Sequence, residues 1–192
     1  MELREKILDA SVGLISEKGI AGLSMREVAR RLNVTHQAPY HHFKDRSEIL
    51  AAVAERGFDQ LAATMRQRVE AEKDPVAKFE ACGEAYVEFA VASPALFRVM
   101  LRPELTGRRH KAATAKASAR AHAVLSEVVT GLRAAGYARK LDPEALTLTG
   151  WSVAHGLAAL LIDSPLGGTR ADAKAMARTV GSTMGKLLSA AR

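Results

Sequence analysis

The chain has 192 residues, of which 48% are hydrophobic, so it can bury a core and is not expected to be disordered. The single cysteine, Cys82, excludes a disulfide framework, and no Cys/His cluster has zinc-ligand spacing, so no metal and no cofactor are expected. The formal charge of +7 indicates a polyanionic partner, although residues 98–140 hold ten basic and two acidic residues and carry most of it.

The N-terminal residues MELREKILDA carry charges inside the first turns and do not form a signal-peptide pattern. Apolar runs such as LAALLI are far shorter than the roughly 20 residues that a membrane span needs. A cytoplasmic protein with no membrane partner is therefore expected.

Helix signals begin at the start of the chain, and only short turns separate them. An apolar face repeats through the first helix, which ends at Gly19. Ser24 and Glu27 form a capping-box pattern that opens a short second helix. After a turn of roughly three residues, Thr35 can cap a short third helix, and a second box pattern, Asp45–Glu48, opens a long fourth helix.

Three later helix starts pair a capping side chain with a proline at the first helical position, where the backbone N–H has no partner in any case. These pairs are Asp74-Pro75, Ser93-Pro94 and Asp142-Pro143, and Thr169 with Asp172 resembles a further cap. No strand-like alternation is found. The expected fold is all-α, with nine helices.

Residues 24–42 give a helix, a turn and a second helix, behind a longer first helix, which is the outline of a helix-turn-helix. The second of these short helices is too polar to be core. Pro39 falls in its first turn, where it loses about one hydrogen bond and stiffens the chain. The side chains expected to read base edges or bind phosphates are His36, Gln37, Tyr40 and His41.

The stretch GIAGLSMREVARRLNVTHQAPYHHFKDRSEIL closely resembles the DNA-binding region of the tetracycline-repressor-like (TetR) family of bacterial transcription regulators. The resemblance covers roughly the first 50 residues and rests on Gly19, Ser24, Val34-Thr35, the Tyr40-x-x-Phe43 signature and a basic residue, Arg46, where lysine is usual. It implies a double-stranded DNA operator as partner. The residues that it places at the DNA are Ser24, Thr35, His36, Gln37, Ala38, Tyr40, His41, His42 and Arg46.

A weaker resemblance covers part of the later chain. The stretches SPALFRVMLRPELTG (93–107) and WSVAHGL (151–157) resemble the ligand-sensing domain of the WHG-type subgroup, named for a tryptophan and a His-Gly pair. In that family this half is all-helical, holds an effector pocket and dimerises through its last two helices. The resemblance thus implies a three-helix helix-turn-helix DNA-binding domain at 1–46, joined by a long helix to a larger helical ligand-binding and dimerisation domain at 47–192.

Aromatic and apolar residues on two predicted helices are the candidates for the effector pocket. One face of the first carries Phe79, Cys82, Tyr86 and Phe89, and Trp151 and His155 share a face of the second. Plain helix core is the alternative for each residue, and a nucleophilic Cys82 has little support because no partner histidine is implied. The full candidate set is Phe79, Cys82, Tyr86, Phe89, Phe97, Trp151 and His155.

The last predicted helix carries small and apolar residues at heptad-like spacing, namely Ala173, Ala177, Val180, Met184 and Leu187. Small side chains permit close approach of another helix, so a homodimer through a four-helix interface with residues 143–162 is expected. Core packing within one chain is the alternative.

The remaining charged and histidine residues have plainer interpretations. Arg30 and Arg31 are expected on a solvated face, and Arg26, near the capped helix start, is either solvated too or a phosphate contact. His36, His41 and His42 lack a carboxylate that would complete a metal site. The basic excess of residues 98–140 is interpreted as solvated surface, with a second anionic contact as the alternative.

The sequence therefore predicts a dimeric, ligand-responsive DNA-binding regulator of transcription. We expect a repressor that binds a pseudo-palindromic operator and is released by an unknown small-molecule effector. The alternatives are a sequence-indifferent basic DNA-binding protein and an activator with the same architecture. An enzyme is not expected, because no motif combines a nucleophile, a base and oxyanion donors.

Overall fold

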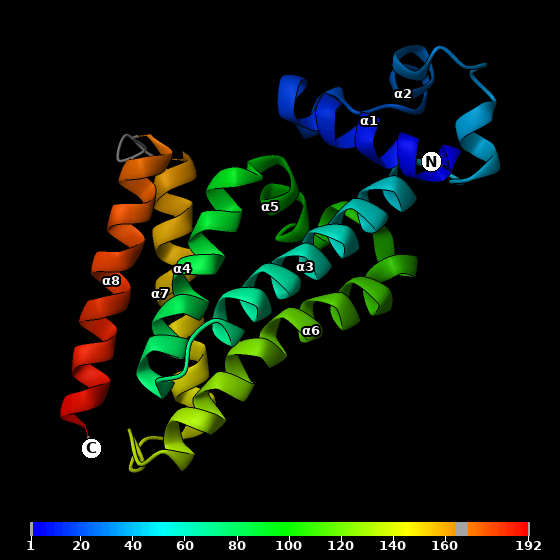
Figure 1. The fold of residues 1–192 in the computed structure, drawn as a ribbon. Helices are drawn as coiled ribbons and strands as arrows, with labels where there is room; N and C mark the ends of the chain where they lie inside the picture. Colours follow the sequence, from blue (N-terminus) through cyan, green and yellow to red (C-terminus); the bar gives the residue numbers. More distant parts are fainter. Residues whose placement is uncertain (1, 164–168, 192) are drawn as a thin grey trace. The chain divides into compact units, whose positions relative to one another are not determined.

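The computed structural model describes residues 2–163 and 169–191, and within them it contains eight α-helices, three 3₁₀-helices and no strand (Figure 1). The all-α prediction is confirmed. In chain order the elements are α1 (Leu3–Lys18), η1 (Ile20–Gly22), α2 (Met25–Leu32), η2 (Ala38–His41), α3 (Arg46–Glu70), α4 (Pro75–Ala92), α5 (Pro94–Met100), η3 (Pro103–Leu105), α6 (Gly107–Ala134), α7 (Pro143–Asp163) and α8 (Arg170–Ala190).

The chain forms two compact units, and each of them draws on two separate segments. The first unit comprises residues 1–58 and 93–118, and the second unit comprises 59–92 and 119–192. Helices α3 and α6 thus supply residues to both. Helix α5 belongs to the first unit because it packs closely on α3: a Cβ atom added at Gly57 would lie 2.9 Å from the Met100 sulfur. A separate domain at residues 1–46 stays a prediction.

The first unit is built around α1, which packs against α2 and α5. Its apolar face is fully buried at Ile7 and Leu14, as the sequence periodicity predicts. Arg56 ties α3 to α1, because its Nη1 donates to Asp9 Oδ1 at 2.6 Å and its Nη2 donates to Glu5 Oε2 at 2.5 Å. These two ion pairs connect α1 to the helix that follows the segment between α2 and α3.

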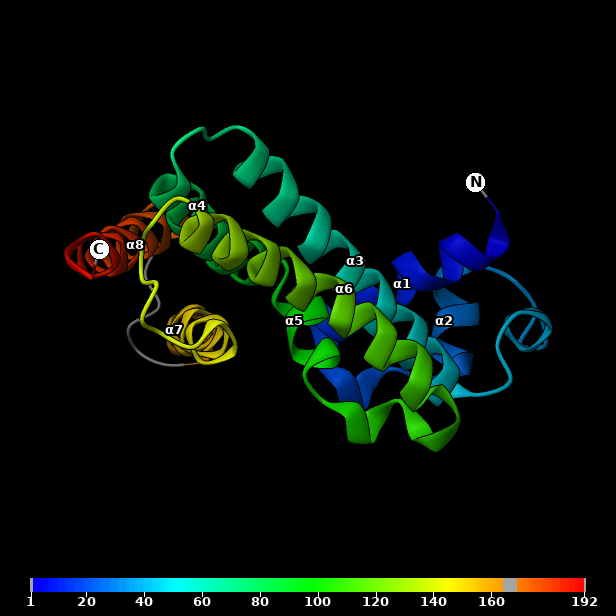
Figure 2. The same cartoon turned by 90° about the horizontal axis from the view of Figure 1, so that it is seen from below.

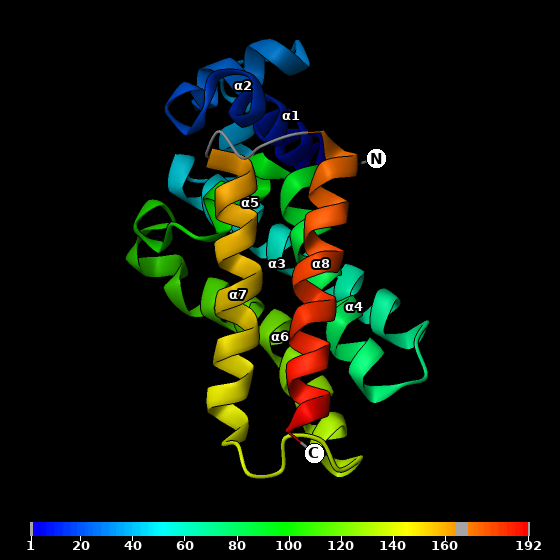
Figure 3. The same ribbon diagram turned by 90° about the vertical axis from the view of Figure 1, so that its left-hand side faces the viewer.

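In the second unit, α4 packs against both α7 and α8, and Figure 2 shows these two helices nearly end-on beside it. Figure 3 shows α7 and α8 running side by side. Helix α8 approaches α4 closely at Gly185, where an added Cβ would overlap the Glu80 carboxylate. A larger residue at that position would require the Glu80 side chain to move.

The structure tests the predicted helix caps individually. Asp74 accepts from the N–H groups of Val76 and Ala77, and Asp142 accepts from that of Ala145. Thr169 and Asp172 form the complete capping box. Ser93, by contrast, makes no side-chain cap bond, although α5 begins at Pro94 as predicted.

Two of the predicted capping boxes in the first unit form only one of their two hydrogen bonds. Ser24 Oγ accepts from the Glu27 N–H at 3.1 Å, but the Glu27 carboxylate accepts from Lys18 and Arg30 instead of returning to Ser24. Asp45 accepts from the Glu48 N–H at 3.0 Å, while the Glu48 carboxylate reaches the Lys44 N–H. Both helices still begin where the sequence predicts, because one capping bond satisfies a free N–H at each start.

Helix α7 is unusually apolar for a helix that is mostly uncovered. Among the described residues it is the one helix that is long and apolar enough to cross a membrane, by length and composition only, and just 28% of its most apolar stretch is buried. Packing within the described part of the chain therefore does not account for the apolar surface of α7.

Candidate functional site

The segment between α2 and α3 adopts a tighter conformation than the sequence predicts. Helix α2 ends at Asn33, whose φ of 53° lies in the left-handed region. The predicted third helix is a 3₁₀ turn: Tyr40 N–H donates to Gln37 O at 3.0 Å and His42 N–H donates to Pro39 O at 3.1 Å. Because Pro39 has no N–H, an α-helical ladder through this segment would lack a bond, and the expectation of an α-helix was wrong.

Thr35 does not cap this segment through its side chain. Its backbone carbonyl accepts from the Ala38 N–H at 3.0 Å instead, and no side-chain bond caps η2. The Thr35 hydroxyl is exposed and is therefore available to another molecule.

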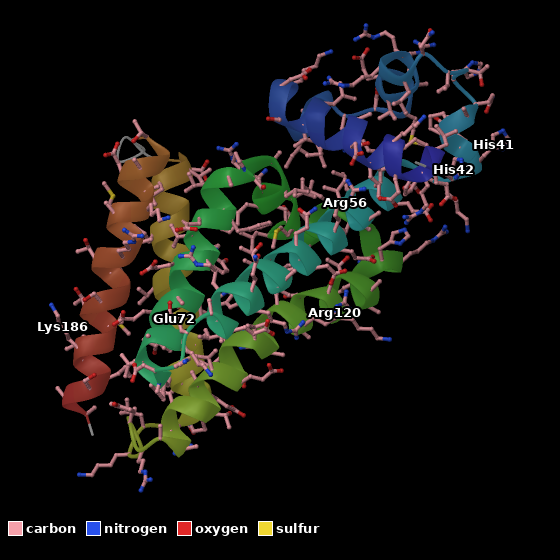
Figure 4. The ribbon with its side chains drawn as sticks, viewed as in Figure 1. His41, His42, Arg56, Glu72, Arg120 and Lys186 are labelled. Carbon is pink, nitrogen blue, oxygen red and sulfur yellow. The ribbon has the colours of Figure 1, made fainter. Side chains whose placement is uncertain are left out.

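Two buried residues fix the segment and turn its polar side chains outward. Pro39 is buried and Phe43 is only 1% exposed, and they hold the turn against the first unit. Ala38 and His42 are half-buried. Figure 4 labels His41 and His42 on this segment. The exposed members of the predicted DNA-binding set here are Thr35, His36, Gln37, Tyr40 and His41.

The arginines of α2 differ in how they are engaged. Arg30 Nη2 lies 3.0 Å from Glu27 Oε2, and Arg31 Nη2 lies 2.7 Å from Glu17 Oε1, so both guanidinium groups are paired. Arg26 is exposed and makes no ion pair within the described part of the chain. Among the arginines of α2, Arg26 is the one that remains unpaired in the described residues, and its phosphate contact stays a prediction.

Arg46 occupies an unexpected position for a phosphate contact. Its Nη2 donates to the backbone carbonyl of Ile20 at 2.6 Å, and the side chain is half-buried with a buried Nε. The residue thus connects α3 to η1, 26 residues earlier in the chain. Lys44, two residues before it, is exposed and was not among the predicted contacts. The sequence feature that could have indicated Lys44 is its position directly after Phe43.

Four of the predicted pocket residues meet around one small cavity in the second unit. Phe79, Cys82, Tyr86 and Trp151 line a space of about 30 Å³. Tyr86 Oη lies 3.1 Å from His155 Nδ1, and the Tyr86 and Trp151 rings meet edge to face with centroids 5.0 Å apart. Burial raises the pKa of Tyr86 above its ordinary value and that of Cys82 to about 12.

Phe89 and Phe97 do not join this cluster. Phe89 is buried in α4 but is not among the cavity residues, and Phe97 is buried in α5 of the first unit. Both residues are buried as helix core in this structure, and their place in an effector pocket stays a prediction.

A second small space adjoins the aromatic cavity, and Phe79 borders both. A neighbouring space of about 30 Å³ shares Phe79, Gly83, Gly150 and Ala154 with it. The Phe79 ring lies against Gly150, since a Cβ there would be 3.0 Å from Phe79 Cζ. Each space is far below the roughly 300–1,000 Å³ of typical ligand pockets, so an effector requires the two to merge or to widen.

A larger cleft, which no sequence pattern indicates, lies elsewhere in the second unit. It measures about 310 Å³ and is bordered by residues of α3, α4 and α6. Charges of both signs are present, with Arg66 and Lys78 against Glu70 and Glu127. Spacing along any one helix cannot reveal this cleft, because it is formed by three.

The predicted dimer residues divide into two groups. Ala173 and Ala177 are buried, Val180 and Met184 are half-buried, and all but Ala173 line the space shared with α4 and α7. Leu187 is 62% exposed. Large apolar side chains exposed on α7 and α8 are Leu148, Leu160, Met176 and Leu187.

Comparisons with known proteins agree with this arrangement. Residues 7–53 match the family model described as bacterial regulatory proteins, tetR family, and residues 79–183 match the tetracyclin repressor-like C-terminal domain. The transcriptional regulator AcrR of Shigella flexneri is 39% identical over 54 residues, which span 28% of this chain and 25% of that relative. The chain thus matches only about a quarter of that relative's length.

Two solved structures illustrate the shared fold. A protein of unknown function from Rhodococcus sp. RHA1 is 29% identical, with a TM-score of 0.86 over 100% of this chain and 97% of that one. AibR, solved in complex with isovaleryl coenzyme A and operator DNA, is 23% identical, with a TM-score of 0.70 over 97% of this chain and 98% of that one. The matched segments cover both the helix-turn-helix region and most of the later helices. The chain belongs to the tetR family of bacterial regulatory proteins.

Proposed function

We propose that the chain is a ligand-responsive repressor that binds operator DNA as a homodimer and is released by a small-molecule effector. The observation that carries the proposal is the row of exposed hydrogen-bonding side chains from Thr35 to His41, fixed from below by the buried Pro39 and Phe43. Such groups on a rigid support can read base edges in the major groove. Family membership supports the same activity. The protein then acts by binding in the cytoplasm, without catalysis.

The contacts to DNA divide by chemistry. Base readout rests on His36, Gln37 and His41, whose side chains both donate and accept hydrogen bonds. Backbone anchoring rests on Arg26, Thr35 and Tyr40, with Ser24, Ala38 and His42 supporting the segment. Lys44 joins the backbone contacts, and Arg46 acts mainly by holding η1 against α3.

The homodimer places two reading segments on one operator. The uncovered apolar face of α7 and α8 supports this assembly, because Leu148 and Leu187 are each 62% exposed and α7 is mostly unburied. A two-fold dimer would read a pseudo-palindrome with half-site centres roughly 34–36 Å apart or somewhat more. The interface then centres on Leu148, Leu160, Met176 and Leu187 rather than on Ala173 and Ala177.

The effector enters the second unit by displacing Phe79, which merges the two small cavities. The merged space is lined by aromatic and apolar groups with one hydrogen-bonded pair, Tyr86 and His155, so it suits a mainly apolar ligand with one polar group. AibR provides a precedent within the same fold for binding both an acyl thioester and DNA. The ligand releases DNA only if it prefers the conformation that does not bind the operator.

Fluorescence-anisotropy titration against duplexes from upstream of the chain's own gene and against scrambled duplexes tests the proposal. A regulator binds one native duplex at least about a thousandfold more tightly than scrambled DNA. Equal, steeply salt-dependent binding to all duplexes would contradict it and favour the sequence-indifferent alternative. Calorimetry of a candidate ligand with and without operator tests release, since equal affinities would exclude coupling between the two sites.

A further inference from the structure

A cluster of basic side chains in the first unit takes no part in the DNA-reading segment between α2 and α3. Between residues 98 and 118 the chain carries six basic residues, namely Arg98, Arg102, Arg108, Arg109, Lys111 and Lys116, against the single acidic residue Glu104. All six basic side chains are exposed. The density of positive charge here is higher than in the helix-turn-helix region itself.

The basic residues at the start of α6 differ in their pairing from several other cations of the first unit. Lys18, Arg30, Arg31 and Arg56 each form an ion pair with a carboxylate. In contrast, across residues 2–163 and 169–191 no ion pair involves the basic residues of the first three turns of α6, which are Arg108, Arg109, Lys111 and Lys116. Their mutual repulsion is therefore not relieved within the described part of the chain.

The position of these residues on α6 is also unfavourable for the isolated protein. Arg108, Arg109 and Lys111 lie in the first turns of the helix, where the helix dipole favours acidic side chains and opposes cations. Thr114 and Ala117 of the same helix are buried. The cations thus project from a fixed helix, and an anionic partner would remove both sources of instability.

The start of α6 lies beside the start of α3, which follows the DNA-facing segment. A Cβ added at Gly107 would lie 3.2 Å from Ser47 Oγ. The pKa of Asp45 lies below its usual range chiefly because Ser47 donates a hydrogen bond to its carboxylate, and the charge of His110 adds a smaller effect. The residue before Arg108 therefore lies close to Ser47, three residues after the exposed Lys44.

We propose that Arg108, Arg109 and Lys111 bind the phosphate backbone of DNA outside the base pairs read by residues 36–41. This surface lengthens the footprint of each protomer and supplies affinity without sequence information. It rests on the proposed function for its partner, and it predicts that operator affinity depends on flanking DNA that carries no specific bases.

The test compares three proteins on four duplexes. The α6 variant carries Arg108→Gln, Arg109→Gln and Lys111→Gln. A control variant, equal in charge, carries Arg139→Gln, Lys140→Gln and Lys186→Gln, which are exposed residues of the second unit; Lys186 is labelled in Figure 4. The duplexes are the operator cut to its half-sites, the same operator with roughly six random base pairs added at each end, and two scrambled duplexes of equal lengths.

The wild type and the control variant are expected to bind the extended operator about tenfold more tightly than the short one, and the α6 variant is expected to lose most of this gain. The slope of log K against log salt on the extended duplex should fall by roughly 0.9 for each phosphate that the variant no longer neutralises. Circular dichroism should show an unchanged helix content, with a melting temperature equal to or above that of the wild type, because cations are removed from a helix start.

The inference would be overturned if all three proteins gained the same affinity from the added flanking base pairs and still bound the operator specifically. If the wild type instead bound scrambled and operator DNA equally, the proposed function would fail. In that case, a smaller salt slope on the scrambled duplex for the α6 variant alone would still support phosphate contacts by the α6 cations. The same decrease in both variants would refute them.

Discussion

Arg46 illustrates how one residue can serve the fold where a family pattern implies a contact. Replacing Arg46 with methionine removes the bond from its guanidinium to Ile20 O while keeping the aliphatic stem. A hydrogen bond from a charged group contributes about 1.5–3 kcal/mol, so the free energy of urea unfolding should fall by about that amount. Operator affinity should fall indirectly.

Lys44→Met is the matched control for Arg46. Lys44 is exposed, so its replacement should leave the unfolding free energy within about 0.5 kcal/mol and lower the salt slope of DNA binding by about one per protomer. If Arg46→Met instead left stability unchanged and lowered the salt slope, Arg46 would be the phosphate contact and Lys44 would not be needed for that role.

Cys82 is expected to be chemically inert in the folded protein. Its side chain is 2% exposed, and burial raises its pKa to about 12, so almost no thiolate exists at neutral pH. Labelling with a disulfide reagent at mildly alkaline pH should occur only as fast as the second unit opens, and it should become rapid in denaturant. Fast labelling of the native protein would show that the aromatic cavity opens readily without a ligand.

At the scale of elements, α4 and α8 approach each other closely at Gly185. A Cβ there would overlap the Glu80 carboxylate, which ends a flexible side chain and can turn away, and it would lie 3.0 Å from Val76 Cγ1, so Gly185→Ala should destabilise the protein by about 1 kcal/mol or less. Gly181→Ala, whose Cβ would have 3.7 Å to its nearest neighbour, should be neutral or stabilising because alanine favours the helix. Thermal unfolding of both variants measures these changes in stability. The double variant Gly185→Ala/Glu80→Ala shows how much of the loss comes from the overlap with the Glu80 carboxylate.

Helix α2 should make the stability of the protein sensitive to acid. Hydrogen bonds from Arg30 and then Lys18 lower the pKa of Glu27 from 4.5 to about 2. Because the folded-state pKa is the lower one, the ionised carboxylate stabilises the fold above about pH 4.5, and this contribution is lost as the pH falls towards 2. Urea unfolding between about pH 6 and pH 3 should show a shallower decline for Glu27→Gln than for the wild type. Identical slopes would mean that the ion pairs do not persist in solution.

Local signals predicted most of the elements, and long-range contacts account for the failures. Helix starts at Asp74, Asp142 and Thr169 depend on bonds within three residues, so the sequence alone is sufficient. The contact of Arg46 with Ile20 and the position of α5 in the first unit depend on tertiary packing, which no spacing pattern encodes. The position of Pro39 predicts a stiff first turn, but its effect extends further and converts the whole expected helix to a 3₁₀ turn.

The predicted ligand pocket shows the same division between local and tertiary information. Helical spacing correctly brought Phe79, Cys82 and Tyr86 to one face of α4, and they meet Trp151 of α7. It did not predict the volume of the space between them, because volume depends on how far apart two helices pack. The cleft beside Arg66 and Lys78 was missed for the same reason.

At the scale of the whole molecule, the apolar face of α7 and α8 is the feature that a single chain leaves unexplained. Leu148 and Leu187 are each 62% exposed, one on each helix, and exposed apolar surface of this kind usually marks an interface. Replacing both with aspartate would place charges at the centre of the proposed dimer, where burial without a partner is costly. Sedimentation velocity should therefore show a dimer for the wild type and a monomer for this variant.

Leu141→Asp is the control for that experiment, since Leu141 is 46% exposed but lies between α6 and α7 and outside both helices. It should remain dimeric. Because one protomer reads only one half-site, the monomeric variant should also lose specific operator binding while retaining weak, salt-sensitive affinity for any duplex. A Leu148→Asp/Leu187→Asp protein that stayed dimeric and bound the operator normally would show that the protomers associate through a different surface.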